Sequence, residues 1–235
     1  ALPILATSRF NQYGEVARVS ILGKKGVFLL SPDANEFLTV DKDKQFSSKS
    51  AYEPFLKDTF PDALGLMDFE DHAHHRKIMQ AAFKKEAMMS YMGVLNQSAA
   101  DTIATWDVTP PFLFFPHIKS LLFNQAAIVF MGESLGPVAT QLIGYFTTTV
   151  AGTVAMLRLM IPGTAFYKAV KSSLALRQYL IDKIPEKRQA LSADLFSQLC
   201  FAKSEDGAQF TDQQIAKHMP GLMSAAHETT SSAIY

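Results

Sequence analysis

The sequence is poor in cysteine, and Cys200 is its single example among 235 residues. One thiol excludes an internal disulfide framework and favours a reducing compartment, so the chain is expected in the cytoplasm.

The sequence has no excess of either charge, because Lys plus Arg and Asp plus Glu number 22 each, and it contains no basic block. The chain therefore lacks the cationic density that nucleic-acid binding requires.

Repeats of a fixed period and low-complexity tracts are also absent, which excludes solenoids and arrays. What remains is a globular composition, 48% hydrophobic and 19% charged, with enough length for a large core. One uncharged stretch, residues 134–157, is long enough to span a bilayer. Because Pro137, glycines and threonines dilute its hydrophobicity, a buried or channel-lining helix is favoured over a transmembrane span.

The hydrophobic pattern predicts a mainly α-helical fold with a small N-terminal β-hairpin. The hairpin covers residues 17–30 with a turn at 23–26, and Ser31-Pro32-Asp33 is typical of a helix start. Residues 46–71 are expected to be irregular. Helices are expected around residues 72–83, 88–106, 118–131, 138–157, 166–184 and 194–201. Pro185 is interpreted as a break, Thr211 to Gln214 as a capping box, and His218 as the approximate start of the last helix.

The last helix carries an unusual polar run, Ala225-Ala226-His227-Glu228-Thr229-Thr230-Ser231-Ser232. Serine and threonine inside an apolar helix compete for backbone carbonyls, and they can bend a helix where a small ligand must fit. A threonine-rich helix with a solvated Glu228 is the alternative interpretation of this stretch alone.

A second cluster, His72-Ala73-His74-His75-Arg76-Lys77, lies before an apolar run. His72 and Arg76 are four residues apart and share a helix face, so they can grip one anionic group, with arginine offering a fork suited to a carboxylate. A solvated basic face is the alternative. A zinc site is disfavoured, because this spacing does not converge three imidazoles on one tetrahedral ion.

The order of these segments resembles the first half of a cytochrome P450. The resemblance rests on an N-terminal hairpin, a His-x-x-x-Arg ahead of Ala82-Phe83, several helices, and Ala225 to Thr230. Ile161 to Thr164 and Glu205-Asp206-Gly207 are also similar to the family. The resemblance covers nearly the whole chain, so residues 1–235 are interpreted as a single incomplete P450 domain.

The resemblance implies roles for particular residues. His72 and Arg76 would bind the haem propionates, and Ala226 would be the small residue that packs over the haem, at a position where the family most often has glycine. Glu228 and Thr229 would be the acid–alcohol pair that relays protons to the dioxygen being activated. No separate metal site is expected.

The family's cysteine-ligand loop, Phe-x-x-Gly-x-x-x-Cys-x-Gly, is absent from the sequence, as is its Glu-x-x-Arg helix. Cys200 lacks the flanking glycines and is interpreted as a small buried hydrophobe, while Glu15-Val16-Ala17-Arg18 matches the second pattern by coincidence. The chain is therefore expected to be an N-terminal half, truncated after Tyr235.

The intact parent is expected to be a haem monooxygenase that oxidises a lipophilic small molecule with dioxygen. Its electrons would come from a redox partner, a ferredoxin or a flavoprotein reductase. Peripheral membrane association remains open. The chain alone is expected to be inactive without the thiolate. The alternative function is a haem-free helical binding module or an inactive remnant.

Overall fold

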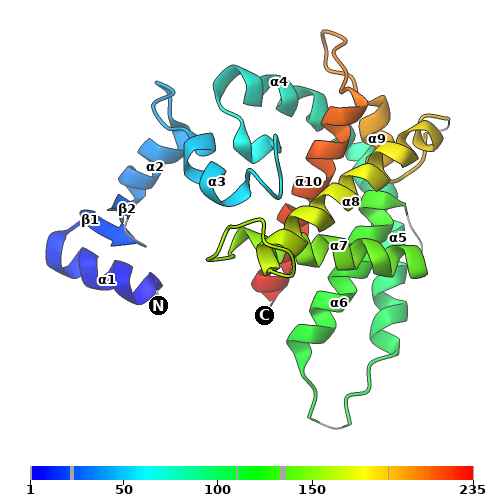
Figure 1. The fold of residues 1–235 in the computed structure, drawn as a ribbon, viewed down its shortest axis with the longest axis horizontal. Helices are drawn as coiled ribbons and strands as arrows, with labels where there is room; N and C mark the ends of the chain where they lie inside the picture. Colours follow the sequence, from blue (N-terminus) through cyan, green and yellow to red (C-terminus); the bar gives the residue numbers. More distant parts are fainter. Residues whose placement is uncertain (1, 22–23, 110, 133–135, 190, 235) are drawn as a thin grey trace. The chain divides into compact units, whose positions relative to one another are not determined.

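The computed structural model describes residues 2–21, 24–109, 111–132, 136–189 and 191–234. The chain divides into two compact units, residues 1–47 and 48–235. Most of the described chain is helical, and the predicted fold class, mainly α with a small hairpin, is confirmed (Figure 1). The single incomplete domain stays a prediction.

The first unit is built around the predicted hairpin. Strands β1 (Val16–Ile21) and β2 (Lys24–Leu29) pair antiparallel, with Val16 opposite Leu29. The second strand begins at Lys24, so most of the predicted turn at 23–26 is strand, and residues 22 and 23 lie outside the described part.

Two helices flank the hairpin in the sequence, α1 (Leu2–Tyr13) and α2 (Pro32–Val40). The second begins where predicted, because the Ser31 side chain accepts a hydrogen bond from the Ala34 amide at 3.2 Å and Pro32 follows it. The first was not predicted, since residues before the hairpin show only weak helical periodicity.

The second unit is almost entirely helical. Its elements are α3 (Ser48–Leu56), η1 (Leu64–Leu66), α4 (Phe69–Gln80), η2 (Ala81–Phe83), α5 (Lys85–Ala104), α6 (Phe114–Ala126), the π-helical turn η3 (Ala127–Met131), α7 (Pro137–Thr153), α8 (Ala165–Lys187), α9 (Leu195–Phe201) and α10 (Asp212–Ile234). The prediction that residues 46–71 are irregular is wrong for α3, for η1 and for the start of α4.

Two prolines lie inside helices, although Pro185 was expected to end one. Pro185 falls within α8, and Pro220 falls within α10, which begins at Asp212 instead of near His218. Proline removes one backbone hydrogen bond, and packing of neighbouring residues offsets that loss. Ile184 and Met219, each directly before a proline, are completely buried. Tertiary burial therefore overrides the local signal.

The core of this unit lies among the middle segments of its long helices. Its completely or almost completely buried side chains include Ile78, Phe146, Leu176, Leu180, Ile184, Phe196, Ile215 and Met219. Each contributes on the order of 2 kcal/mol by leaving water. Helix α10 packs against α6 and α8, so its buried face is fixed by the core.

Helices α7 and α8 lie side by side (Figure 1). A Cβ atom added at Gly152 would be 2.1 Å from the Ala169 Cβ, so only glycine permits this close approach. Within the described residues, no helix combines the length and apolar character needed to cross a bilayer. Helix α7, in the stretch considered as a possible span, ends at Thr153.

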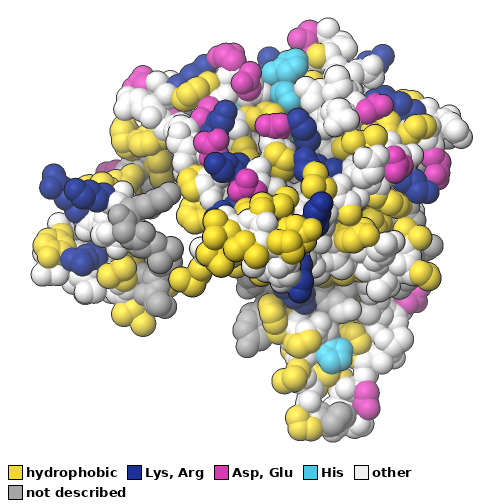
Figure 2. Space-filling model, in the orientation of Figure 1, with side chains coloured by type: hydrophobic (Ala, Val, Ile, Leu, Met, Phe, Trp, Pro, Cys, Tyr) yellow, Lys and Arg dark blue, Asp and Glu magenta, His cyan; other side chains and the backbone are white. Residues whose placement is uncertain are grey.

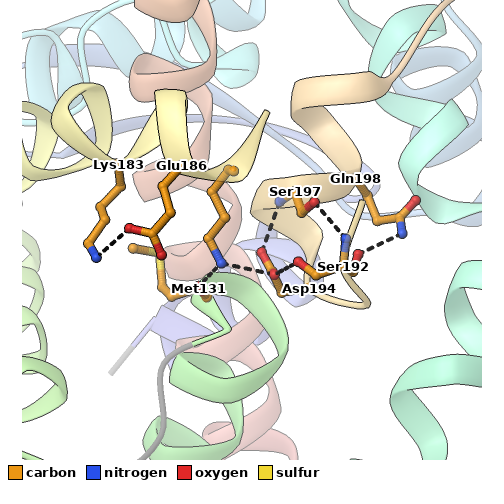
Figure 3. Close-up of polar contacts among 8 residues, drawn as sticks. Met131, Lys183, Glu186, Ser192, Asp194, Ser197 and Gln198 are labelled. Carbon is orange, nitrogen blue, oxygen red and sulfur yellow. Dashed lines mark hydrogen bonds and ion pairs between the residues drawn. The ribbon is translucent and has the colours of Figure 1, made fainter. Parts of the chain in front are cut away.

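A buried ion pair joins the ends of three elements of this unit (Figure 3). The Lys187 ammonium, at the end of α8, lies 2.9 Å from the Asp194 carboxylate and donates to the Met131 carbonyl at 2.8 Å. Asp194 also caps α9 by accepting from the Ser197 amide at 2.8 Å. The ion pair also requires glycine at position 132, because a Cβ atom there would lie only 2.7 Å from the Asp194 carboxylate.

Replacing Asp194 with asparagine should destabilise this unit strongly. Asparagine keeps the size of the side chain and an oxygen for the cap, but it leaves the Lys187 ammonium without a carboxylate. Because both side chains are largely buried, at 13% and 6% exposed, the free energy of unfolding should fall by about 3 kcal/mol in urea denaturation.

The matched control is Glu186→Gln, which breaks the 2.9 Å pair between Glu186 and Lys183 one turn away. The Glu186 side chain is exposed and solvent screens its charge, so this variant should unfold almost as the unaltered protein does. Equal losses in both variants would contradict the role given to the buried pair.

Candidate functional site

The polar run of the last helix lies in the C-terminal half of α10. The predicted capping box forms at the start of this helix, since the Thr211 amide donates to Gln214 Oε1 at 2.8 Å and the Gln214 amide to Thr211 Oγ1 at 3.3 Å. It then remains α-helical to Ile234 despite its serines and threonines. The hydroxyls of Thr229 and Ser231 bond to carbonyls of the helix itself, and Ser231 donates to the His227 carbonyl at 2.7 Å.

Thr229 lies on an exposed side of α10, and its hydroxyl donates to the Ala225 carbonyl at 2.5 Å. Ala225, one turn earlier, is also exposed. Ala225 and Thr229 therefore form a strip of α10 that is exposed and accessible to a ligand. The side chain of Glu228, the other predicted catalytic residue, lies outside the described part, although its backbone belongs to α10.

Ala226, predicted to pack over the haem, is half-buried and lines a different feature, an apolar groove of about 380 Å³. The groove is formed by α5, α6, η3 and α10, with Tyr91 and Thr230 among its lining residues. Burial raises the pKa of Tyr91 to about 12. Sequence reasoning did not single out Ala225, although the i, i+4 spacing to Thr229 was visible.

The predicted cationic pair lies on α4. His72 is half-buried and Arg76 is exposed one turn later, so both project from neighbouring positions of one helix. In the part of the chain that the structure describes, neither side chain has a hydrogen-bond or ion-pair partner. Two cationic or hydrogen-donating groups without a protein acceptor form a donor set that suits the carboxylates of haem.

Helix α4 is tied to α10 by a pair of histidines that the sequence pattern did not reveal. His75 Nδ1 and His218 Nε2 are 2.7 Å apart, and Gln214 Nε2 lies 3.4 Å from His75 Nε2. Both rings also contact Phe210, with centroids 5.4 and 4.9 Å away. Since 143 residues separate the two histidines, no local signal could have linked them.

The environment of this pair disfavours its charged forms. His218 is only 1% exposed, and burial, with His75 as the next cause, lowers its pKa to about 4. Burial followed by the neighbouring His74 also lowers the pKa of His75, which Asp71 partly opposes. Both rings are therefore neutral near pH 7, and one of them donates the shared proton to the other.

Cys200 is the single thiol, and it lies in α9 at 2% exposure. Burial raises the pKa of its thiol to about 11, so it carries no thiolate at neutral pH and does not fit an iron ligand. The prediction of a small buried hydrophobe is confirmed. Among the residues with described positions, no group of three or more histidine, cysteine or acidic side chains is placed to hold a metal ion.

The chain matches the family model "Cytochrome P450" over residues 5–235. A putative cytochrome P450 136 of Mycobacterium tuberculosis is 32% identical over 212 residues, which cover 88% of this chain and 43% of the relative. Abscisic acid 8'-hydroxylase 4 of Arabidopsis thaliana is 27% identical over 235 residues, covering 98% of this chain and 49% of the relative. The chain thus spans about half the length of these curated relatives.

Solved structures agree with this match. The retinoic acid-bound cyanobacterial CYP120A1 superposes with a TM-score of 0.80 at 25% identity, covering 97% of this chain and 52% of the other. The mainly helical fold with a small antiparallel hairpin is the fold of this family. The chain belongs to the cytochrome P450 family.

The histidine pair should make stability depend on pH. The pKa of His218 is lower in the folded protein than its ordinary value of 6.5, so protonation of this ring favours the unfolded chain. Its contribution to the free energy of unfolding is therefore complete above pH 6.5 and is lost as the pH falls towards about 4. His218→Gln keeps a partner for His75 but does not titrate there. Urea unfolding between pH 7.5 and pH 4.5 should therefore show a flatter pH dependence in this variant.

The control is His117→Gln in α6, where the ring packs against Trp106 and Phe112. This variant should keep the pH dependence of the unaltered protein. If His218→Gln loses stability with falling pH as steeply as the control does, the histidine pair is not the cause.

Proposed function

We propose that the protein to which this chain belongs is a haem monooxygenase that oxidises a lipophilic small molecule. The observation that carries the proposal is the exposed strip of α10, where Thr229 and Ala225 lie one turn apart on a helix whose other side packs against α6 and α8. Haem supplies the oxygen-activating chemistry when it is bound.

His72 and Arg76 are the residues proposed to hold the haem through its propionates. Their support is chemical, because an imidazole and a guanidinium that bond to no other described residue are available to carboxylates. The thiolate ligand is proposed to come from outside these 235 residues, since the thiol of Cys200 is buried in α9 and protonated at neutral pH.

Thr229 and Glu228 are proposed to move protons. The Thr229 hydroxyl donates to the Ala225 carbonyl, so its oxygen still accepts hydrogen bonds, and donation to a ligand requires rotation away from that carbonyl. Glu228, the preceding residue, would resupply the proton as a general acid. Ala226 lines the apolar groove in this structure. Its proposed contact with the haem edge requires this residue to change position when haem binds.

The substrate is proposed to be lipophilic. Two of the similar proteins are named for abscisic acid and beta-amyrin, and a similar solved structure is titled as bound to retinoic acid, and all three molecules are largely apolar. Electrons are proposed to come from a separate redox partner, either a ferredoxin or a flavoprotein reductase.

Replacing Arg76 with alanine in the full-length protein should reduce the haem content of the purified enzyme. The guanidinium is the stronger of the two propionate donors, and losing a charge-assisted bidentate contact costs about 2 kcal/mol, or roughly thirtyfold in haem affinity. Haem per polypeptide, measured as the pyridine haemochrome, reports the loss. Lys77→Gln removes the next cation on α4 and should retain haem, while equal occupancy in Arg76→Ala would remove the propionate role.

Replacing Thr229 with alanine should separate electron consumption from product formation. The hydroxyl is needed for proton delivery and not for holding substrate, so product per electron should fall by about tenfold while the substrate Kd stays nearly constant. Thr229→Ser keeps a hydroxyl and should restore coupling. Thr230→Ala, on the groove side, is the matched control. Unchanged coupling in Thr229→Ala would overturn the assignment.

A further inference from the structure

The histidine pair that joins α4 to α10 belongs to a longer chain of hydrogen bonds with a fixed direction. At its outer end, the Thr211 amide donates to Gln214 Oε1 at 2.8 Å. Because a backbone N–H can only donate, the oxygen of the Gln214 side chain must face Thr211, and its NH2 group then faces His75 Nε2 at 3.4 Å. Turning this side-chain amide over would place two donors against each other, so the orientation of Gln214 is fixed.

The orientation of Gln214 decides the tautomers of both histidines. His75 Nε2 accepts from the Gln214 amide, so the proton of the neutral ring lies on Nδ1, which donates to His218 Nε2 at 2.7 Å. His218 Nε2 is then an acceptor, and the proton of its own neutral ring lies on Nδ1. Within the part of the chain that the structure describes, this buried Nδ1 has no hydrogen-bond partner.

An apolar residue would fill position 218 at a lower cost to the fold. The His218 side chain is 1% exposed, and Ile215 and Met219 on the same stretch of α10 are completely buried. A buried N–H without an acceptor destabilises the folded protein, and leucine or methionine would bring no such group. Packing alone therefore does not favour histidine here. The property that those residues lack is a nitrogen that accepts the hydrogen bond from His75.

The part of α4 that carries the residues proposed to bind haem is anchored sparsely. Of the residues of α4, all of which the structure describes, only Ile78 and Met79 near its end are buried. The main backbone contacts of α4 are with η1 and η2, which adjoin it in the chain. Histidine side chains reach the surface over α4 (Figure 2), and among them the half-buried His75 bonds across to α10.

His75 lies on the face of α4 that carries His72 and Arg76. His72 precedes His75 by three residues and Arg76 by four, so the three side chains are neighbours on the surface of the helix. His75 is bonded to α10, whereas His72 and Arg76 bond to no described residue. A rotation of α4 that broke the His75 contact would therefore move the other two side chains as well.

We propose that His218 is a positioning residue for haem. By accepting the hydrogen bond from His75 it fixes the rotation of α4, and so holds His72 and Arg76 where they meet the haem propionates. Gln214 acts one step further out, because it keeps the His75 ring in the tautomer that donates to His218. This inference rests on the proposed propionate role of His72 and Arg76, and it gives His218 no contact with haem or substrate.

The test measures haem release from the full-length protein, as the rate of haem transfer to excess apomyoglobin, and needs no turnover. His218→Leu removes the acceptor and should speed release by about tenfold, the effect of one hydrogen bond. His218→Gln places an acceptor oxygen near the position of Nε2 and should keep release within about twofold of the unaltered rate. If His218 served packing alone, leucine would retain haem as well as glutamine does, and that result would overturn the proposal.

A double-mutant cycle with Arg76 separates positioning from a general loss of stability. In the Arg76→Ala protein, His218→Leu should speed release by no more than about threefold, because only His72 is left to be positioned. An equal effect in both backgrounds would show that His218 does not act through Arg76, and would overturn the proposal. Failure of the proposed function has a different signature, since Arg76→Ala alone would then release haem at the unaltered rate. That result would remove the basis of this inference too.

Gln214→Leu provides a second variant if His218→Leu does not fold, because residue 214 is only half-buried in the first turn of α10. It removes the donor to His75 Nε2 and should speed haem release by about threefold. Thr211→Ala is the matched control, because it weakens the same capping box while the Thr211 amide still holds Gln214 Oε1. This control should unfold at a lower urea concentration and release haem at the unaltered rate. Equal release rates in Gln214→Leu and Thr211→Ala would contradict the proposed positioning.

Discussion

The buried contact of the Lys187 ammonium with the Asp194 carboxylate and the Met131 carbonyl fixes the arrangement of the helical unit. It joins the end of α8 and the start of α9, seven residues apart, to the π-helical turn after α6, which lies 56 residues before Lys187. Low local dielectric makes the pair strong only while all partners are present. Gly132 is part of the same constraint, since any side chain there would occupy the space of the pair.

The position of α10 follows from this frame. Its buried face packs against α6 and α8, where the His227 ring stacks on Phe123 with centroids 3.7 Å apart. Nearer its start, His218 bonds His75 of α4. Because these contacts fix the rotation of α10, its opposite side, with Ala225 and Thr229, is left open. The His75–His218 contact also connects α10 to α4, the helix that carries Arg76. The residues proposed to bind haem and those proposed to move protons therefore lie on two helices in direct contact.

Much of the fold was predictable because its signals are local. The Ser31 cap, the Thr211–Gln214 capping box and the periodicity of α5 and α8 each involve residues within a few positions of one another. The errors at the prolines have one physical source. Pro185 was interpreted as a break and the last helix was expected to begin near His218, but α8 and α10 continue through Pro185 and Pro220, because burial of Ile184 and Met219 outweighs the lost hydrogen bonds. For the candidate site, the sequence indicated His72, Arg76 and Thr229, and missed Ala225 and the His75–His218 pair.

The sequence by itself determined the family and the helical class, because these depend on motif order and short-range spacing. Only the tertiary structure decided which side chains meet. It buried Cys200, placed Ala226 in a groove, bonded His75 to a residue 143 positions away and turned Arg158 back onto Asp58. Such contacts depend on how distant helices pack, and a one-dimensional pattern carries no record of that packing.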